Sequence, residues 1–375
     1  MKKRNLFLAL IGSLVFAGCK DETEIIVVND EEAQEVWFED VATNVRVVPL
    51  VSEEPIGSIR NMICYGNEII ALDNDKKTVY YFDNGTLVSK MNHEGRGRGE
   101  YVDIKRYTYS PSKKVLYVVS DDKILWYSVP GMRYCGNTPI SYTMNFLSMH
   151  DDDHFFGVIC KNQRFLAALI DIETGEITSE IEEISMYNHE ESNISMSSYS
   201  KERHYYSKSD FNNTIVTVKP DNETKVLLKY NFGDKSIPEK YMDFDLKNPM
   251  NFGKLFEYMD ENGKTRLLGN QFLRIRGNEI SFWYYYAVGS MGVKNYFRYN
   301  IKDKTIINLK GFRIKGINRP IMPFAVSDDG YIALFEGNPE WYKTDEEASS
   351  LAESILHEMK NQEINNPVVL FYDIK

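Results

Sequence analysis

Residues 106–131 read "RYTYSPSKKVLYVVSDDKILWYSVPG", and their pattern indicates the class of fold. Short runs of Tyr, Val, Leu and Ile are broken first by a Ser- and Lys-rich turn and then by an Asp-containing turn. Aromatic and β-branched residues favour strands, and the polar breaks favour hairpin turns. The stretch therefore predicts three consecutive antiparallel strands, a pattern typical of a sandwich, barrel or propeller.

The same scheme recurs along most of the chain. Further copies lie at residues 68–91, 155–181, 281–309 and 324–337. Each copy with its connections takes about 45–50 residues, which is the size of a four-stranded propeller blade. The roughly 340 residues behind the N-terminal leader divide into six or seven such blades, and we expect six.

A ring of sheets has to close, because an open edge invites aggregation. The segments at residues 35–51 and 366–375 both look like strands and can pair within one blade. The sequence therefore predicts an all-β fold over residues 35–375. We expect a single six-bladed β-propeller of four-stranded antiparallel blades, closed by its N- and C-terminal strands.

Two segments break the β pattern. Residues 344–361 predict a helix, because Thr344 and Glu347 have the spacing of a capping box. Five apolar residues line one face of this helix: Ala348, Leu351, Ala352, Ile355 and Met359. Residues 237–263 predict one or two short helices inserted between blades. Neither segment is long enough for a second domain.

The N-terminus carries a processing signal. Residues 2–4 are basic, and residues 6–16 form an apolar run shorter than the ~20 residues of a membrane span. Small residues then precede Cys19. This arrangement resembles a bacterial lipobox, which implies that residues 1–18 are cleaved and that Cys19 is lipidated. An ordinary secretory signal that contains a cysteine is the alternative.

Residues 20–24, "KDETE", form an acidic cluster behind Cys19. The cluster resembles the signal that sends Bacteroidetes-type lipoproteins to the outer face of the outer membrane. We therefore expect a lipid-anchored protein on the outer membrane, at the cell surface, with a periplasm-facing anchor as the alternative. Residues 19–34 are predicted to be an acidic, flexible tether.

The charge excludes one class of partner. The chain has a net charge of −11, and loss of the three basic residues 2–4 on cleavage makes it −14. Nucleic acids and anionic headgroups need a basic footprint, so nucleic acid is not an expected partner. Cys64, Cys135 and Cys160 are widely spaced and predict neither a disulfide framework nor a zinc site. They are expected to be small buried residues, with at most one pair bridged.

Several short motifs together resemble the six-bladed β-propeller lipoproteins of Bacteroidetes, which are related to NHL-type and TolB-like propellers. They are Pro49 with Leu50, Ile56 with Gly57, the stretch from Phe82 to Gly85, the stretch from Gly95 to Tyr101, and the closing "NPVVLFYDIK". The resemblance implies the propeller fold and a place in the cell envelope. Arg98 stands where that family usually has Pro.

The loop at residues 95–101, "GRGRGEY", is the candidate ligand-binding segment. It lacks the spacing of a dinucleotide fingerprint and the Gly-Lys-Ser/Thr of a P-loop, and a strand rather than a helix follows it. One interpretation is a basic loop at the channel mouth, where Arg96 and Arg98, with Glu100 and Tyr101, contact an anionic ligand. The preferred interpretation is a glycine crossover between two blades, which Glu100 and Tyr101 lock.

Two further clusters have a functional and a structural interpretation. Residues 150–154, "HDDDH", have metal-type ligands but lie where a hairpin turn is expected, and strand neighbours alternate faces. We therefore predict a solvated turn and no metal. The aromatic run at residues 283–286 could stack on a sugar, although packing between blades is the more common use of such residues.

The sequence predicts function only at the level of a class. We expect a non-catalytic binding or scaffolding propeller for a glycan, a peptide or an outer-membrane protein partner, without a cofactor. The alternative is a metal-dependent lyase- or lactonase-type enzyme with its site at the central channel. No nucleophile elbow and no zinc-protease motif occurs in the sequence, and no catalytic residue is predicted.

Overall fold

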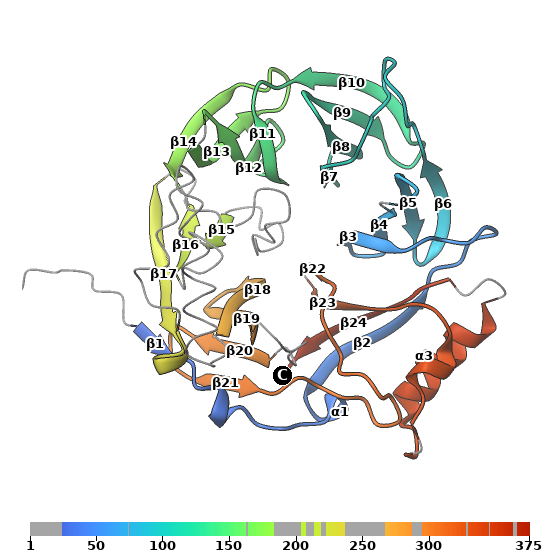
Figure 1. Cartoon of the computed structure of the whole chain (residues 1–375), viewed down its shortest axis with the longest axis vertical. Coiled ribbons are helices and arrows are strands. Elements are labelled where there is room, and N and C mark those ends of the chain that lie inside the picture. Colours follow the sequence, from blue (N-terminus) through green and yellow to red (C-terminus); the bar gives the residue numbers. More distant parts are fainter. Residues whose placement is uncertain are drawn as a thin grey trace, which may run out of the picture.

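The computed structural model forms a ring of six four-stranded sheets (Figure 1). The predicted six-bladed propeller is thus confirmed. The structure describes residues 25–73, 75–162, 164–183, 204–207, 214–218, 223–236, 267–286, 295–327, 329–344, 346–362 and 366–375. The predicted signal peptide, Cys19 and the insertion at residues 237–263 lie outside the described residues. Within the described ranges, no helix has the length and apolar character of a membrane span.

Each blade begins at the centre of the ring and ends at its rim (Figure 1). Blade 1 comprises β3 (Ile59–Tyr65), β4 (Glu68–Asp73), β5 (Thr78–Asp83) and β6 (Thr86–Met91). Blade 2 comprises β7 (Arg106–Ser110), β8 (Val115–Ser120), β9 (Lys123–Ser128) and β10 (Arg133–Pro139). Blade 3 comprises β11 (Thr143–Met149), β12 (His154–Lys161), β13 (Arg164–Asp171) and β14 (Ile177–Glu183).

The other three blades complete the ring, two of them with N-terminal strands. Blade 4 comprises β15 (His204–Ser207), β16 (Thr214–Val218), β17 (Thr224–Asn231) and the outer strand β1 (Ile25–Val27). Blade 5 comprises β18 (Leu267–Arg276), β19 (Glu279–Tyr286), β20 (Asn295–Asn300) and β21 (Ile306–Leu309). Blade 6 comprises β22 (Ala325–Ser327), β23 (Gly330–Phe335), β24 (Val368–Ile374) and the outer strand β2 (Ala42–Pro49).

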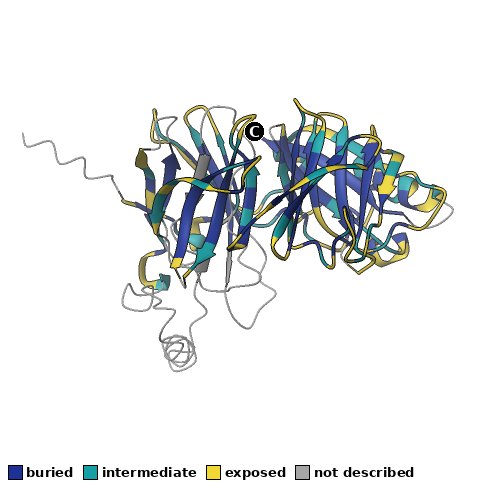
Figure 2. Cartoon of the chain, turned by 90° about the horizontal axis from the view of Figure 1, so that it is seen from above, coloured by how far each residue is buried: buried dark blue, intermediate teal, exposed yellow. Residues whose placement is uncertain are grey.

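The core lies between neighbouring blades rather than within one blade. The middle strands are buried on both faces, as in β8, where every residue from Leu116 to Ser120 is buried. Outer strands such as β6 alternate between exposed and less exposed residues, because only their inner face meets another sheet. Figure 2 shows this distribution, with buried strands between exposed turns. The sequence forms continuous apolar runs where a strand is central and alternating runs where it is peripheral.

The ring is closed in blade 6, where the N-terminal strand β2 pairs with the C-terminal strand β24. The pairing is antiparallel, and Val47 lies opposite Leu370. The backbone N–H of Leu50 also donates to the carbonyl of Pro367 at 2.9 Å. The closure predicted from the two ends of the chain is therefore confirmed.

The structure also shows an N-terminal belt, residues 25–41, which runs along the rim of blades 4, 5 and 6 (Figure 1). Strand β1 pairs in parallel with β17, Gln34 bridges to Leu309 of blade 5, and Trp37 bridges to Arg313. Ile26 and Val28 are buried. Residues 25–34 are thus ordered where the sequence predicts a flexible tether. In the part of the chain that the structure describes, β15 to β17 are three strands of blade 4, and the β-branched run at residues 25–28 supplies the fourth.

Short helices complete the belt and the rim. They are η1 (Asp30–Glu32) and α1 (Phe38–Val41) in the belt, η2 (Gly233–Lys235) after β17, and η4 (Pro339–Tyr342) and α3 (Ser350–Asn361) between β23 and β24. The predicted helix exists, but the predicted start at Thr344 is wrong. Ser349 caps α3 by accepting a hydrogen bond from the N–H of Ala352, whereas the Thr344 hydroxyl accepts from the N–H of Glu346 in a local turn.

Candidate functional site

The loop at residues 95–101 crosses from the outer strand of blade 1 to the inner strand of blade 2. Gly99 has a φ of +77°, and a Cβ there would lie 2.6 Å from the ring of Tyr134. The carbonyl of Gly99 accepts a hydrogen bond from the hydroxyl of Tyr127 in blade 2 at 3.0 Å. The Glu100 carboxylate accepts from the N–H of Gly97 at 2.7 Å. These contacts give the glycines and Glu100 structural roles in the crossover.

Tyr101 holds the same crossover against blade 1. Its side chain is 1% exposed, and its hydroxyl donates to the carbonyl of Lys77 at 2.8 Å and accepts from the N–H of His93 at 3.0 Å. Burial raises the pKa of Tyr101 to about 12, so its hydroxyl stays protonated and able to donate. Arg96 and Arg98 are exposed. Ligand contact through these arginines stays a prediction.

Residues 150–153 form the turn between β11 and β12, which begins at His154, and the sequence predicts a hairpin here. The Asp151 carboxylate accepts from the N–H groups of Asp153 and His154 at 2.8 and 2.6 Å. Asp152 accepts from the hydroxyl of Ser112 in blade 2 at 2.6 Å. The turn therefore folds on itself and ties blade 3 to blade 2. Across the part of the chain that the structure describes, no three His, Cys, Asp or Glu side chains converge as metal ligands.

The aromatic run on β19 packs between blades where its side chains are described. Trp283 and Tyr284 are fully buried. Trp283 lies 5.1 Å from Phe312, centroid to centroid, and the Tyr284 hydroxyl donates to the Asn308 side chain at 2.6 Å. The side chains of residues 285 and 286 lie outside the described residues. A sugar platform on Trp283 or Tyr284 is therefore excluded by burial.

The three cysteines within the described residues form no disulfide with one another. Cys64 is buried as predicted, whereas Cys135 is exposed and Cys160 is intermediate. The prediction that all three are buried is thus wrong. Cys135 lies on the outer strand β10, beside a register shift between Tyr134 and Gly136, which explains its exposure.

A cavity of about 340 Å³ opens where blades 5, 6 and 1 meet. Its rim is formed by the turns between the first and second strands of these blades, which we call the inner-turn face. The lining residues are Asn44, Arg46, Gly66, Asn67, Arg276, Asp329, Gly330, Tyr331, Phe371 and Tyr372. The volume is in the range of small-ligand sites, about 300–1,000 Å³.

Arg46 of β2 is fixed in this cavity by neutral groups. Its guanidinium carbon lies 4.3 Å from the ring centroid of Phe371, in a cation–π contact. One guanidinium nitrogen donates to the side-chain oxygen of Asn67 at 2.9 Å, and the other donates to the carbonyl of Gly66 at 3.3 Å. These contacts orient the guanidinium without neutralising its charge.

A buried ion-pair cluster adjoins the cavity through Arg276, one of the lining residues. Asp373 of β24 accepts from Arg274 at 2.7 Å and from Arg276 at 3.2 Å. The side chains of Arg274 and Asp373 are only 7% and 12% exposed, whereas that of Arg276 is 68% exposed. One carboxylate thus holds two guanidinium groups, and only Arg276 extends into the solvent at the cavity.

The strand that carries both arginines is irregular. β18 shifts register against β19 on both sides of Gln271, and Phe272 has a φ of +52°, which is uncommon for an aromatic residue. Bulges of this kind redirect the side chains that follow, here Arg274 and Arg276. Strained backbone often accompanies functional sites, so the irregularity adds to the case for this cavity.

The floor of the cavity is uncharged. Tyr331 and Tyr372 are almost completely buried, and burial raises the pKa of both phenols well above the usual range. Gly330 brings the backbone of blade 6 so close to β24 that a Cβ would lie 2.2 Å from the carbonyl oxygen of Tyr372. The side chains available to a ligand are therefore the polar ones at the rim.

The two described sites differ in position along the ring axis. The crossover at residues 95–101 leaves the outer strand of blade 1 beside Lys77, which lies in the turn between β4 and β5. That turn is at the opposite end of β4 from Gly66 and Asn67. The arginine-containing loop and the inner-turn cavity thus lie at opposite ends of the propeller.

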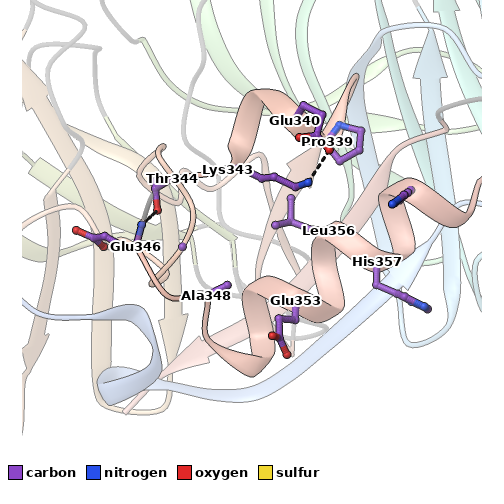
Figure 3. A pocket seen from close by; sticks show the side chains of 11 residues that line it. Pro339, Glu340, Lys343, Thr344, Glu346, Ala348, Glu353, Leu356 and His357 are labelled. Carbon is purple, nitrogen blue, oxygen red and sulfur yellow. Dashed lines mark hydrogen bonds and ion pairs between the residues drawn. The ribbon is translucent and has the colours of Figure 1, made fainter.

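A second cavity, of about 330 Å³, lies on the rim between η4 and α3 (Figure 3). Lys343 pairs with the carboxylate of Glu340 at 2.5 Å, and Leu356 and His357 of α3 form the other side. Two of its charged groups, Lys343 and Glu340, already pair with each other, and the cavity lies far from the ring centre (Figure 1). It is therefore the weaker candidate for ligand binding.

Sequence reasoning missed the arginines of the inner-turn cavity. A signal was present on β18, where Arg274 and Arg276 are two residues apart and so share one face of a strand. A second signal was Asp373, a carboxylate near the end of an otherwise apolar closing strand. Their convergence with Arg46 depends on the ring closure, which joins distant segments.

The chain matches the family described as "Domain of unknown function (DUF4934)" over residues 23–373. No curated protein matches it. A solved structure from Bacteroides fragilis NCTC 9343, of a protein whose description proposes that it is exported, superimposes with a TM-score of 0.67. The two chains are 13% identical, over 94% of this chain and 100% of that one.

A member of the DUF4221 family from Bacteroides vulgatus ATCC 8482 superimposes with a TM-score of 0.52 at 13% identity. The match covers 89% of this chain and 98% of that one. At these identities the likeness shows the fold alone. The resemblance to propellers of Bacteroidetes that the sequence motifs indicate is confirmed.

Proposed function

Since the chain belongs to the family "Domain of unknown function (DUF4934)", we propose that it acts outside the cytoplasm as a non-catalytic propeller that binds a ligand on its inner-turn face. The observation that carries this proposal is the cavity lined by Arg46 and Arg276 where blades 5, 6 and 1 meet. Ligand sites are concave and combine a few well-placed polar groups with a preformed floor, as this cavity does.

The chemistry of the cavity favours binding over catalysis. Among its described lining residues there is no His, Cys, Ser or Lys, the groups that most often act as nucleophiles or bases. Asp373, which lies behind the lining residue Arg276, is already shared by two arginines. The lyase or lactonase alternative requires ionisable ligands that converge on a metal, and the cavity offers guanidinium groups in their place.

The proposed location is the outer membrane, with Cys19 lipidated and the propeller displayed on the cell surface. The lipobox-like leader supports this location, as does the description of the similar structure as exported. The alternative is a periplasm-facing anchor. If the anchor is present, residues 20–24 are all that separate the lipidated cysteine from β1, so blade 4 would lie close to the bilayer.

Replacement of Cys19 by Ser is expected to move the protein from the membrane fraction to the soluble fraction. The reason is that serine lacks the thiol to which the lipid anchor is attached. Fractionation with immunoblotting measures the change. The matched control is Cys135→Ser, an exposed thiol in blade 2 that should leave the protein in the membrane fraction. Retention of the Cys19→Ser protein with the membranes would contradict the anchor.

A ligand that binds the native propeller should raise its melting temperature. Binding at a concentration 100 times the dissociation constant stabilises the folded state by about 2.7 kcal/mol. We expect such a shift with at least one member of a panel of soluble oligosaccharides and peptides, measured by differential scanning fluorimetry on the full chain in detergent. The panel is run with and without divalent metals. A shift seen only with a metal present would support the enzyme alternative, and a panel without any shift would contradict small-ligand binding.

A further inference from the structure

We infer that the inner-turn cavity binds a saccharide that carries a uronate, with Arg46 and Arg276 holding the carboxylate. The inference rests on the proposed function, since it names the ligand class of the same cavity. It follows from three features of the cavity: its charge, the geometry of its guanidinium groups, and the nature of the surface that it leaves exposed.

The cavity is locally cationic in an acidic protein. The whole chain has a net charge of −11. Arg46, Arg276 and Asp329 nevertheless line the cavity. Behind Arg276 lies Asp373, which also pairs with Arg274, so that the group has three guanidiniums and two carboxylates. The local excess is one positive charge, which a ligand with a single negative charge would balance. Such a ligand is attracted to this place, whereas the net negative charge of the whole chain repels it.

The geometry favours a carboxylate as the anionic group. The planar guanidinium fork matches a carboxylate in a bidentate contact better than an ammonium does. Arg46 is oriented in advance by Phe371, Asn67 and Gly66, so little side-chain freedom is lost on binding. Arg276 donates one described hydrogen bond, to Asp373, and 68% of its side chain is exposed.

A carboxylate also fits better than a phosphate monoester. The exposed carboxylate of Asp329 lies at the rim of the same cavity. It would repel the nearly double charge of a phosphate monoester more strongly than the single charge of a carboxylate. Asp329 can instead accept hydrogen bonds from neutral hydroxyl groups on the ligand.

The rest of the ligand must be rich in hydroxyl groups, because the exposed surface of the cavity is polar. Asn44, Asn67 and Asp329 are exposed at its rim. The aromatic residues of its floor offer little area, since Phe371 is 7%, Tyr372 1% and Tyr331 0% exposed. An apolar peptide side chain would find almost no surface to cover. Sugar hydroxyls both donate and accept, which amide and carboxylate side chains match.

Calorimetric titration of the full chain in detergent tests the inference. The probes are trimers of galacturonate, glucuronate and mannuronate, each paired with its neutral methyl ester. We expect at least one acid to bind at least tenfold more tightly than its ester, because the ester loses the charge-assisted contacts with the arginines. Arg276→Gln should weaken binding of that acid by about tenfold or more, the effect of losing one hydrogen bond to a charged group.

The matched control is Arg164→Gln. Arg164 lies in blade 3, is 53% exposed and pairs with Glu183 at 3.0 Å. Its substitution therefore removes the same positive charge as Arg276→Gln, but at a place away from the cavity. This variant should bind the acid as the wild type does, and both variants should keep the wild-type melting temperature because both side chains are exposed.

The outcomes separate the inference from the proposed function. If acid and ester bound equally well, the proposed recognition of the uronate carboxylate would be overturned, whereas saccharide binding as such would be supported. If the acid bound tightly and the Arg276→Gln variant bound it with the same affinity, the site would lie elsewhere and the inference would be overturned. Absence of binding by all three acids would also overturn it, and a thermal shift with a peptide in that case would keep the proposed binding function.

Discussion

A chain that begins at residue 35 is expected to lose about 3–6 kcal/mol of unfolding free energy relative to one that begins at residue 25. The lost segment contributes the buried side chains of Ile26 and Val28, each worth about 1.5–3 kcal/mol. It also contributes the fourth strand of blade 4 and the bridge from Gln34 to blade 5. Urea denaturation followed by tryptophan fluorescence measures the difference.

Single substitutions make the test sharper, because neighbouring residues of β1 have opposite environments. Ile26 is 8% exposed, whereas Ile25 is 57% exposed. Ile26→Asp should therefore reproduce much of the loss, since it buries a charge between β1 and the core of blade 4. Ile25→Asp should change the stability by less than about 0.5 kcal/mol, as surface substitutions usually do. Equal effects of the two substitutions would show that the belt does not dock as described.

Asp373→Asn is expected to lower the unfolding free energy by about 3–5 kcal/mol, the usual result of removing one partner from a buried ion pair. Arg274 is 7% exposed and would keep its charge without the carboxylate that accepts it at 2.7 Å. The substitution also weakens the contact between blades 5 and 6 beside the ring closure. Chemical denaturation of the variant and the wild type measures the loss.

Two controls separate the buried charge from a general effect at the surface. Glu279→Gln removes a carboxylate that is 42% exposed and lies 3.9 Å from Arg298, so we expect at most about 1 kcal/mol. The double substitution Arg274→Met with Asp373→Leu removes both charges and should be more stable than Asp373→Asn alone. If Asp373→Asn cost no more than Glu279→Gln, the buried pair would not have the role assigned to it.

The blades and the ring closure could be predicted from the sequence because they depend on local patterns. Apolar runs such as the one at residues 115–119 indicate central strands, and the strand-like ends of the chain indicate the closing pair. The docking of the N-terminal belt on blade 4 could not be predicted from the sequence in the same way. The acidic residues 20–24 and 30–32 flank "IIVV" and suggest a solvated tether, while the need for a fourth strand in blade 4 becomes visible only in three dimensions.

The inner-turn cavity could not be predicted, because its residues come from both ends and the middle of the chain. Arg46 meets Asn67 and Phe371 only after the N-terminal strand has paired with β24 in a particular register. A shift of β2 by one residue would turn the side chain of Arg46 to the other face of the sheet, away from Phe371. The crossover at residues 95–101 was different, since its glycines, Glu100 and Tyr101 form a local structure whose contacts the motif itself suggests.

Uronate binding in the inner-turn cavity is tested by the crystal structure of the propeller with the tightest-binding uronate trimer. We predict density for the saccharide in the inner-turn cavity, with its carboxylate beside the guanidinium groups of Arg46 and Arg276 and its hydroxyls near Asn67 and Asp329. Density at the loop of residues 95–101, or in the rim cavity beside α3, would contradict it.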